Sequence, residues 1–462
     1  MKKIISLTIL SLLFLVSCET EPIEDNSLDV STTLNKGANA NNSYMVISKS
    51  ETLSKDLEKS LGKIGKIINT IPEIGVVVVQ STNPNFEKNA TTITDVRSVV
   101  PDLTVNWLEP MDVDPMANPL SIGSDEPYFP FLWGMDAIDA PEAWNEGYTG
   151  EGVRVAVLDS GIDPTHSDLS PNLNTELSRS FVDGEDWAVQ PGFYFNHGTH
   201  VAGTIAAADN EFGVIGVAPN AEIVAVKVLS EFSGSGGFSG INAGIVYAAN
   251  IDADVINMSL GATLNKNGKF YDDDGNFIGK IPAKYIQEII HAQQRAIDYA
   301  YKKGTIIVVS AGNDAMNGDG NGSTIKLPAD LNNVISVSAT APFAWAFDQT
   351  TNLDEPASYT NIGRSLVDVA APGGDFDSPY NYWWYDMVLS TIPGGWSWSA
   401  GTSMASPHVA GVAALIIGKN GGEMDPHEVE KQLLKSADKI DTNGNSLFYG
   451  KGRVNAYRAV TE

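Results

Sequence analysis

The stretch VRVAVLDSG, residues 153–161, decides the fold, because it begins as a buried strand and ends in a polar turn. Five further strand-like stretches follow at 221–229, 254–260, 304–311, 333–339 and 366–372. Helix candidates lie between them at 197–208, 239–250, 283–303 and 403–418. Continuous apolar strands that alternate with helices indicate a parallel sheet covered on both faces. We therefore expect an α/β domain over residues 131–462.

A smaller α+β unit is expected upstream, over residues 44–112. Residues 44–48 and 74–79 are strand-like, residues 53–64 are helical, and LTVNWLEP (103–110) is expected to form the last strand. Residues 113–130 are expected to be a linker that contains a processing site.

The N-terminus has the pattern of an export signal. Lys2 and Lys3 precede an apolar run, 4–16, that is too short to span a bilayer, so residues 1–17 are interpreted as a signal peptide. The sequence LVSC (15–18) resembles a bacterial lipoprotein signal, in which Cys18 becomes the lipidated first residue; a plain secretory signal is the alternative. Residues 18–43 are polar and are expected to be a flexible tether. Cys18 is the single cysteine, which excludes an intramolecular disulfide.

Charge limits the choice of partners. The 462-residue chain has 57 acidic and 29 basic residues, for a net charge of −28. Nucleic acids and anionic membranes require basic patches, so neither is expected as a partner. We expect a monomer, exported from a bacterial cell, that contacts a membrane only through its lipid.

Three polar positions carry candidate chemistry. Asp159 ends a buried strand, and His197 and Ser403 each open a predicted helix. In open α/β sheets, sites lie at the carboxyl ends of strands. A serine hydroxyl needs an imidazole to remove its proton and a buried carboxylate to orient that imidazole. The three residues therefore favour acyl transfer.

Each residue alone also fits a structural role. Asp159 could cap a turn, and Ser403 could be a helix N-cap. His197 and His200 could form a zinc pair, but the glutamate of a His-Glu-x-x-His motif is missing.

Together, VAVLDSG, NHGTHVAGT and GTSMASPHVAG resemble the three motifs of the subtilisin-like serine proteases (subtilases), in the family's order of Asp, His and Ser. SAGN (310–313) resembles its fourth motif. The resemblance implies a subtilisin-like three-layer α/β fold with a mostly parallel sheet of about seven strands, and a serine endopeptidase that acts on proteins and peptides.

The resemblance also implies residue roles. Ser403 would attack the scissile carbonyl, His197 would take its proton, and Asp159 would orient His197. Asn313 and the Ser403 backbone N–H would bind the oxyanion. Pro407 lacks an N–H, so the Ser403 carbonyl has no i+4 donor in its helix.

A further stretch would pair with the substrate backbone and line the primary pocket. It consists of Ser259, Leu260 and Gly261.

Calcium is the cofactor that the resemblance implies, through hard oxygen ligands; no organic cofactor is expected. The family's usual ligand near the mature N-terminus aligns with Phe129, which cannot coordinate, so Asp125 or Glu126 is expected to substitute. Residues 272–276 and 441–445 are additional candidates that also fit solvated turns. The expected ligands are the side chains of Asp168 and Asn210 and the carbonyls of Ala208, Phe212 and Val214.

Residues 44–112 resemble the family's inhibitory propeptide in pattern. Self-cleavage between about 110 and 126 would then separate the peptidase from a lipid on Cys18.

Two insertions, 261–282 and the aromatic-rich 373–388, set the chain apart. The second could hold a bulky substrate side chain or be a packed surface loop.

Two other functions compete with the endopeptidase. An inactive relative could serve as a binding or scaffold protein. A different hydrolase, such as an esterase, could use the same triad, but GTSMA around Ser403 lacks the Gly-x-Ser-x-Gly elbow of α/β-hydrolases.

Overall fold

A computed structural model describes residues 42–106, 126–189, 195–271, 276–320, 322–377, 382–441 and 445–462. The predicted signal peptide, Cys18 and most of the tether and linker lie outside these residues. Within the described part of the chain, no helix has the length and apolarity that a membrane span requires.

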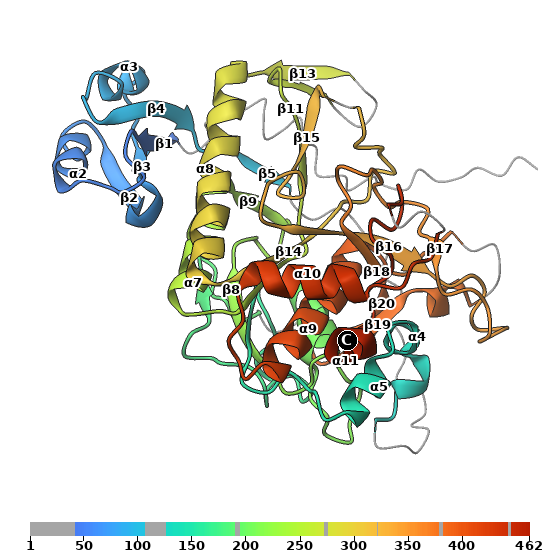
Figure 1. Ribbon diagram of the computed structural model, residues 1–462. Coiled ribbons are helices and arrows are strands. Elements are labelled where there is room, and N and C mark those ends of the chain that lie inside the picture. The colour runs from blue at the N-terminus through green and yellow to red at the C-terminus, as the bar shows by residue number, and fades with distance from the viewer. Residues whose placement is uncertain are drawn as a thin grey trace, which may run out of the picture.

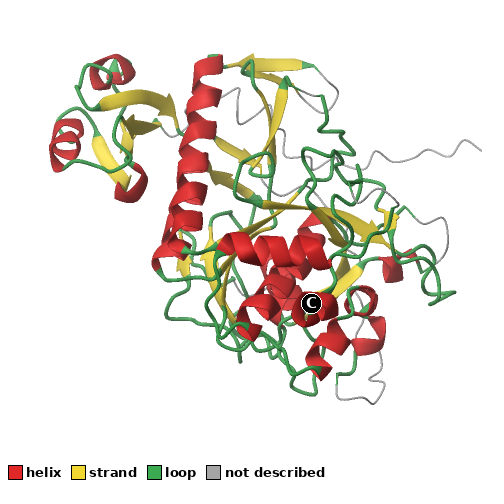
Figure 2. Cartoon of the chain, in the orientation of Figure 1, coloured by secondary structure: helices red, strands yellow, loops and turns green. Residues whose placement is uncertain are grey.

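A large parallel sheet lies at the centre of the molecule (Figures 1 and 2). Seven of its described strands run parallel in the order β18-β16-β14-β10-β6-β8-β7, and the short β17 pairs antiparallel with β16. The prediction of about seven mostly parallel strands is confirmed. The strands are β6 (Arg154–Asp159), β7 (Arg179–Ser180), β8 (Glu222–Lys227), β10 (Val255–Met258), β14 (Ile306–Ser310), β16 (Ile335–Ala341), β17 (Glu355–Pro356) and β18 (Val369–Pro372).

Helices cover both faces of this sheet. In β6, Val155 and Val157 belong to the hydrophobic cluster under α6 and α9, whereas Ala156 and Leu158 belong to the cluster under α7 and α8. This alternation is the period of two that a strand requires. The predicted helices are present, with ends that differ by at most two residues. They are α6 (His197–Ala206), α7 (Phe238–Asn250), α8 (Ala283–Lys303) and α9 (Thr402–Lys419).

Smaller elements complete this part of the chain. The pair β11–β15 and the hairpins β12–β13 and β19–β20 are antiparallel. The elements are η2 (Phe129–Phe131), α4 (Trp133–Ala137), α5 (Ala140–Asn145), β9 (Ser235–Gly237), β11 (Ala262–Asn265), β12 (Lys269–Tyr271), β13 (Phe277–Lys280), β15 (Thr324–Leu327), η3 (Trp383–Asp386), β19 (Val388–Ile392), β20 (Gly395–Ser399), α10 (Pro426–Ser436) and α11 (Ala456–Thr461).

A second, antiparallel sheet lies beside α8 (Figure 1). Its strand order is β2-β3-β1-β4. One face packs through Ile47, Ile74 and Val100 into the cluster that includes α8, and the other face is covered by α2 and α3. The elements are β1 (Ser43–Ser48), α2 (Lys55–Leu61), β2 (Lys66–Ile71), η1 (Pro72–Ile74), β3 (Val76–Gln80), α3 (Phe86–Ala90) and β4 (Val96–Pro101).

The expected last strand of this small unit was placed wrongly. β4 is the last strand of the small sheet, and the chain that follows it forms β5 (Thr104–Asn106), which pairs antiparallel with β9 of the large domain. The difference has a physical reason: strand pattern identifies an extended segment, but which neighbour pairs with it depends on how the small unit docks.

Candidate active site

The candidate site lies where three neighbouring strands end. In parallel strands all carboxyl ends meet at one edge of the sheet, and β14, β10 and β6 are adjacent. Asp159 is the last residue of β6, Ser259 follows β10 directly, and Asn313 follows β14 by three residues. Residues that are far apart in sequence are thereby brought to one edge.

Asp159 and His197 are joined by hydrogen bonds. His197 Nδ1 lies 2.9 Å from both carboxylate oxygens of Asp159. Asp159 is fully buried, and the His197 side chain is only 7% exposed. Because a carboxylate can only accept here, the proton is on Nδ1 and leaves Nε2 as the basic nitrogen of the neutral ring.

Two local contacts hold the start of α6 against the end of β6. The Asn196 side chain caps α6 by accepting from Thr199 N at 2.8 Å, as an N-cap asparagine does. Ser160 Oγ accepts from Gly198 N at 3.1 Å. The serine that follows Asp159 therefore ties the histidine's helix to the aspartate's strand.

Ser403 lies in the first turn of α9, which packs against α6 and the central strands. Pro407 cannot donate to the Ser403 carbonyl, and Ser259 Oγ donates to it at 2.8 Å instead. Ser403 Oγ in turn donates to the Ser259 carbonyl at 3.2 Å. The nucleophile candidate and the segment after β10 are thus joined in both directions.

Asn313 is oriented by Thr402, at the start of α9. Asn313 Oδ1 accepts from Thr402 N at 2.9 Å and from Thr402 Oγ1 at 2.8 Å. Thr402 Oγ1 also accepts from Gly312 N at 3.1 Å. Since Oδ1 is held by these donors, the amide NH₂ group is turned away from them, and its two N–H donors define an anion-binding direction.

The segment after β10 is buried on both sides. Ser259 and Leu260 are buried, and a Cβ built on Gly261 would lie 2.9 Å from Lys326 Cε. Gly261 is therefore required for the close approach of a side chain from β15.

Comparisons with known proteins identify the family. The subtilase family model matches residues 150–452. The chain belongs to the subtilase family. It is 38% identical over 330 residues to subtilisin NAT of Bacillus subtilis subsp. natto, covering 71% of each chain. It is 32% identical to a thermophilic serine proteinase of Bacillus sp. strain AK1, covering 92% of this chain and 89% of the relative.

A solved structure extends the similarity to most of the chain. The epidermin leader peptide processing serine protease of Staphylococcus aureus matches with a TM-score of 0.70 and 25% identity, over 90% of this chain and 97% of that chain. The subtilase described here is therefore a serine endopeptidase with the subtilisin-like fold.

The loop expected to bind calcium is built around two carboxylates. Asp168 Oδ2 accepts from Val214 N at 3.0 Å and from Trp396 Nε1 at 2.8 Å. Glu126 is buried, and its Oε1 accepts from Asn210 N at 2.8 Å and from Glu211 N at 3.1 Å. The burial of both carboxyls raises their pKa values, that of Glu126 to about 7. Asp125, the other expected substitute, lies outside the described residues.

Several oxygen atoms that could bind calcium in this loop accept no hydrogen bond of the kinds described below. Asn210 Oδ1 is buried without a hydrogen-bond partner in the described part of the chain. The carbonyls of Ala208, Phe212 and Val214 accept from no backbone N–H of a described residue. Three His, Cys, Asp or Glu side chains grouped for metal binding are not found in the described ranges. The turn at 272–276 lies almost wholly outside those ranges, and the turn at 441–445 lies mostly outside them.

The two histidines of the possible zinc pair have different partners. His197 Nδ1 is bonded to Asp159, and His200 Nε2 lies 3.1 Å from the Ser397 carbonyl oxygen. The structure gives this pair no third protein ligand among the described residues.

The aromatic insertion packs against the core. Trp383, Trp384 and Tyr385 lie against the cluster under α6 and α9, and Tyr385 contacts Trp398 with ring centroids 5.2 Å apart. Asp386 at its end accepts from Ala344 N and Trp345 N at 2.9 and 2.7 Å. Residues 383–386 are thus packed against the core, whereas Phe376 and Tyr382 of the same insertion are exposed.

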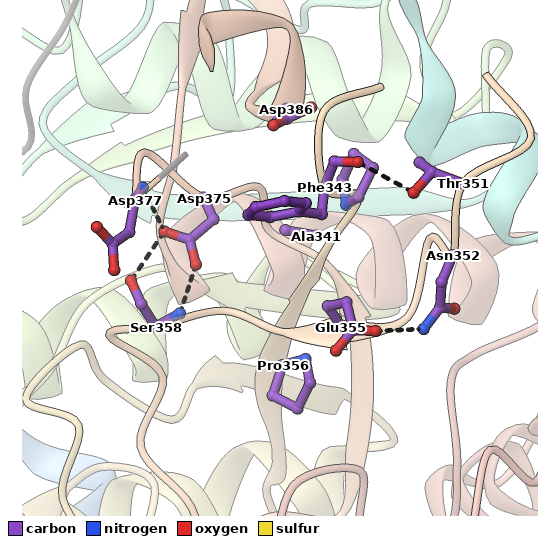
Figure 3. A pocket seen from close by; sticks show the side chains of 11 residues that line it. Ala341, Phe343, Thr351, Asn352, Glu355, Pro356, Ser358, Asp375, Asp377 and Asp386 are labelled. Carbon is purple, nitrogen blue, oxygen red and sulfur yellow. Dashed lines mark hydrogen bonds between the residues drawn. The ribbon is translucent and has the colours of Figure 1, made fainter. Parts of the chain in front are cut away.

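An acidic pocket of about 470 Å³ lies beside this loop (Figure 3). Asp375, one of its carboxylates, accepts from Ser358 N and Oγ. The carboxylates of Asp375, Glu355 and Asp386 in this pocket accept hydrogen bonds that hold the surrounding loops together.

Three positioning roles escaped sequence reasoning. Ser160, Thr402 and the hydroxyl of Ser259 orient groups of the site, yet each is a common small polar residue with no pattern of its own. The only available signal was that each is adjacent to, or inside, a quoted motif.

Two buried histidines beside the site remain neutral. Burial lowers the pKa of His408 to about 4. For His200, burial is the main cause and the nearby His197 adds to it, and together they lower the pKa to about 3. His408 Nδ1 lies 2.8 Å from the Met404 carbonyl.

These shifts predict acid sensitivity. Below the unfolded pKa of about 6.5, the unfolded state binds a proton at His408 that the folded state does not, so the unfolding free energy falls by up to about 1.4 kcal/mol per pH unit from this group. His408→Gln should reduce the loss of stability between pH 6.5 and 5 by about 1.5 kcal/mol. Urea unfolding in a Ser403→Ala background measures this, with the exposed His427→Gln as control; equal pH slopes for wild type and H408Q would contradict it.

Proposed function

We propose that this subtilase is made as a lipid-anchored, self-processing precursor that hydrolyses peptide bonds through Asp159, His197 and Ser403. The observation that carries the proposal is the pair of 2.9 Å contacts from His197 Nδ1 to the Asp159 carboxylate, at the edge where Ser403 opens α9. A neutral imidazole held in this tautomer presents a basic Nε2.

Acylation requires Ser403 to exchange one acceptor for another. In the resting site its hydroxyl donates to the Ser259 carbonyl. As Oγ forms its bond to the substrate carbonyl carbon, the Oγ proton moves to His197 Nε2, and Asp159 stabilises the imidazolium. His197 then protonates the leaving amine as the C–N bond breaks. Water attacks the acyl-enzyme with His197 again as base, which releases the acid and restores Ser403.

Oxyanion stabilisation is assigned to Asn313 Nδ2 and the Ser403 backbone N–H. The Thr402 contacts fix the amide before substrate arrives, so little reorganisation is needed when charge develops.

Ser403→Ala should abolish both labelling by a fluorophosphonate probe and cleavage of casein, because the attacking oxygen is removed. Asn313→Ala should still be labelled at Ser403 by the fluorophosphonate probe, but its kcat should be about 100- to 1000-fold lower, since one oxyanion donor is lost. Steady-state assays on casein peptides measure both.

The competing functions give different results in the same assays. An unlabelled wild-type protein would support the scaffold reading. Ester hydrolysis without any peptide cleavage would support the esterase reading. Either result would refute the proposed endopeptidase.

The small unit is proposed to be the inhibitory propeptide. Its sheet packs on α8, Arg97 pairs with Glu288 at 3.1 Å, and β5 pairs with β9 as an added strand. Asp102 Oδ1 accepts from Ser239 N, in the first turn of α7, where a carboxylate is favoured by the helix dipole. These contacts support a docked unit whose C-terminal tail is directed along the large domain.

Self-cleavage is proposed to release the peptidase from the membrane. Wild-type cells should yield a peptidase whose N-terminus lies between about 110 and 126, in the medium or periplasm. Ser403→Ala should remain full-length in the detergent phase of a Triton X-114 partition, because the lipid on Cys18 is still attached.

The double variant Cys18→Ser, Ser403→Ala is the matched control and should move to the aqueous phase. Detergent partitioning of that double variant would refute the lipid. An active peptidase still joined to its N-terminal segment would refute release by self-cleavage.

Calcium is proposed to bind at the loop of residues 208–214. Asp168, Glu126, Asn210 Oδ1 and the three carbonyls named above offer the hard oxygens that Ca²⁺ prefers. The fit rests on the buried, unpaired Asn210 Oδ1 and on the buried carboxylates, which a cation would neutralise. Bound calcium would supply structural stabilisation of this loop.

Removal of calcium should lower the melting temperature of the Ser403→Ala protein, since a ligand that binds only the folded state stabilises it. Asn210→Ala and Glu126→Gln should each diminish the calcium-dependent rise in melting temperature. Glu176→Gln, at an exposed site away from the loop, is the control. A melting temperature that does not respond to chelator would refute the site.

A further inference from the structure

A buried lysine lies beside the segment that would hold the substrate. Lys326 belongs to β15 and is only 1% exposed, which makes it one of the largest fully buried side chains in the described chain. Lysine is almost never fully buried unless it is paired. Its Nζ pairs with Asp314 Oδ2 at 3.1 Å.

Two glycines create the space for this side chain. A Cβ on Gly312 would lie 2.3 Å from Lys326 Cε and 2.5 Å from Nζ, and a Cβ on Gly261 would lie 2.9 Å from Cε. Gly312 directly precedes Asn313, and Gly261 ends the segment that begins at Ser259. The lysine side chain therefore passes between the two walls that flank the candidate nucleophile.

The position of these walls relates Lys326 to one substrate residue. The substrate carbonyl carbon must reach Ser403 Oγ while its oxygen faces Asn313. The residue that carries this carbonyl, called here the acyl-side residue, then directs its side chain between the Asn313 wall and the Ser259–Gly261 wall. Lys326 Cε lies beside both Gly312 and Gly261, so its side chain borders that space.

Asp314 is the member of the ion pair that can move. Its side chain is 42% exposed, whereas that of Lys326 is 2% exposed. Its Oδ2 also accepts from Thr263 Oγ1 and Asn361 Nδ2, both at 3.2 Å. Burial acts to raise its pKa, but the nearby ammonium and these donors lower it overall, so Asp314 is an anion at neutral pH. Because the Asp314 side chain is partly exposed, its carboxylate can turn into water when another anion takes its place beside Lys326.

We propose that Lys326 selects an acidic acyl-side residue, so that this subtilase cleaves preferentially after glutamate or aspartate. The inference rests on the proposed endopeptidase function and specifies its substrate. A substrate carboxylate would take the place of Asp314 beside the ammonium, in a site of low dielectric where a charge-assisted hydrogen bond is strong. A cationic side chain would be repelled, and a large aromatic ring would meet the lysine stem.

The test compares peptides that differ only at the acyl-side residue: Glu, Gln, Ala, Lys and Phe. The wild-type enzyme should show a kcat/KM for Glu about 10- to 100-fold above that for Gln, as one charge-assisted hydrogen bond allows. Lys326→Met, which keeps a similar stem and removes the charge, should reduce the Glu-to-Gln ratio to about one. The exposed Lys269→Met, on the 261–282 insertion and away from β15, should retain the wild-type ratio.

The outcomes separate this proposal from the proposed function. Fluorophosphonate labelling of Ser403 and casein cleavage establish the peptidase in each variant. An active wild-type enzyme that prefers Phe or Ala, or that cleaves Glu and Gln peptides equally, would overturn the role of Lys326 and leave the endopeptidase intact. If K326M fails to fold, the wild-type Glu-to-Gln ratio alone still decides the proposal.

Discussion

The site depends on a constraint of parallel sheets: all strands end at the same edge. Because β14, β10 and β6 are neighbours, the residues after them are a strand spacing apart, whatever their distance in sequence. Asp159, Ser259 and Asn313 thereby become adjacent without any contact that is specific to catalysis. What remains for side chains to supply is orientation.

Orientation comes from hydrogen bonds that replace missing helical ones. Pro407 interrupts the first turn of α9, and the Ser259 hydroxyl supplies the donor that the Ser403 carbonyl lacks. Thr402 similarly connects its own N–H to Asn313 rather than to a preceding turn. The start of α9 is therefore fixed by the ends of β10 and β14, so Ser403 moves only if the sheet edge moves. A regular first turn would have satisfied its own carbonyl and lost this connection.

The sequence was sufficient for the large domain and insufficient for the small unit's last strand. The six principal strands and four principal helices of residues 131–462 were predictable because the buried parallel strands are short continuous apolar runs and the helical stretches between them are longer. Among the described strands of the small unit, β2 and β4 were missed. In both strands, charged or polar residues interrupt the apolar run. The expected last strand of the unit, β5, pairs instead with β9 of the large domain. The positions of Asp159, His197, Ser403 and Asn313 followed from motifs.

Lys326 shows why such motifs do not reveal specificity. A lysine in a strand as short as β15 looks solvent-exposed in sequence, and its burial depends on two glycines that lie 65 and 14 residues away. Lys227, at the end of β8, is a second buried lysine with an acidic partner. It is fully buried, pairs with Glu185 at 3.0 Å and donates to the Ser160 carbonyl at 2.8 Å. Removing one partner of such a pair leaves an uncompensated buried charge, so each lysine fixes the backbone around it. The two lysines differ in how exposed their acidic partners are. The Glu185 side chain is 13% exposed and holds Lys227 in a structural pair, whereas the Asp314 side chain is 42% exposed and can be replaced beside Lys326 by an incoming anion.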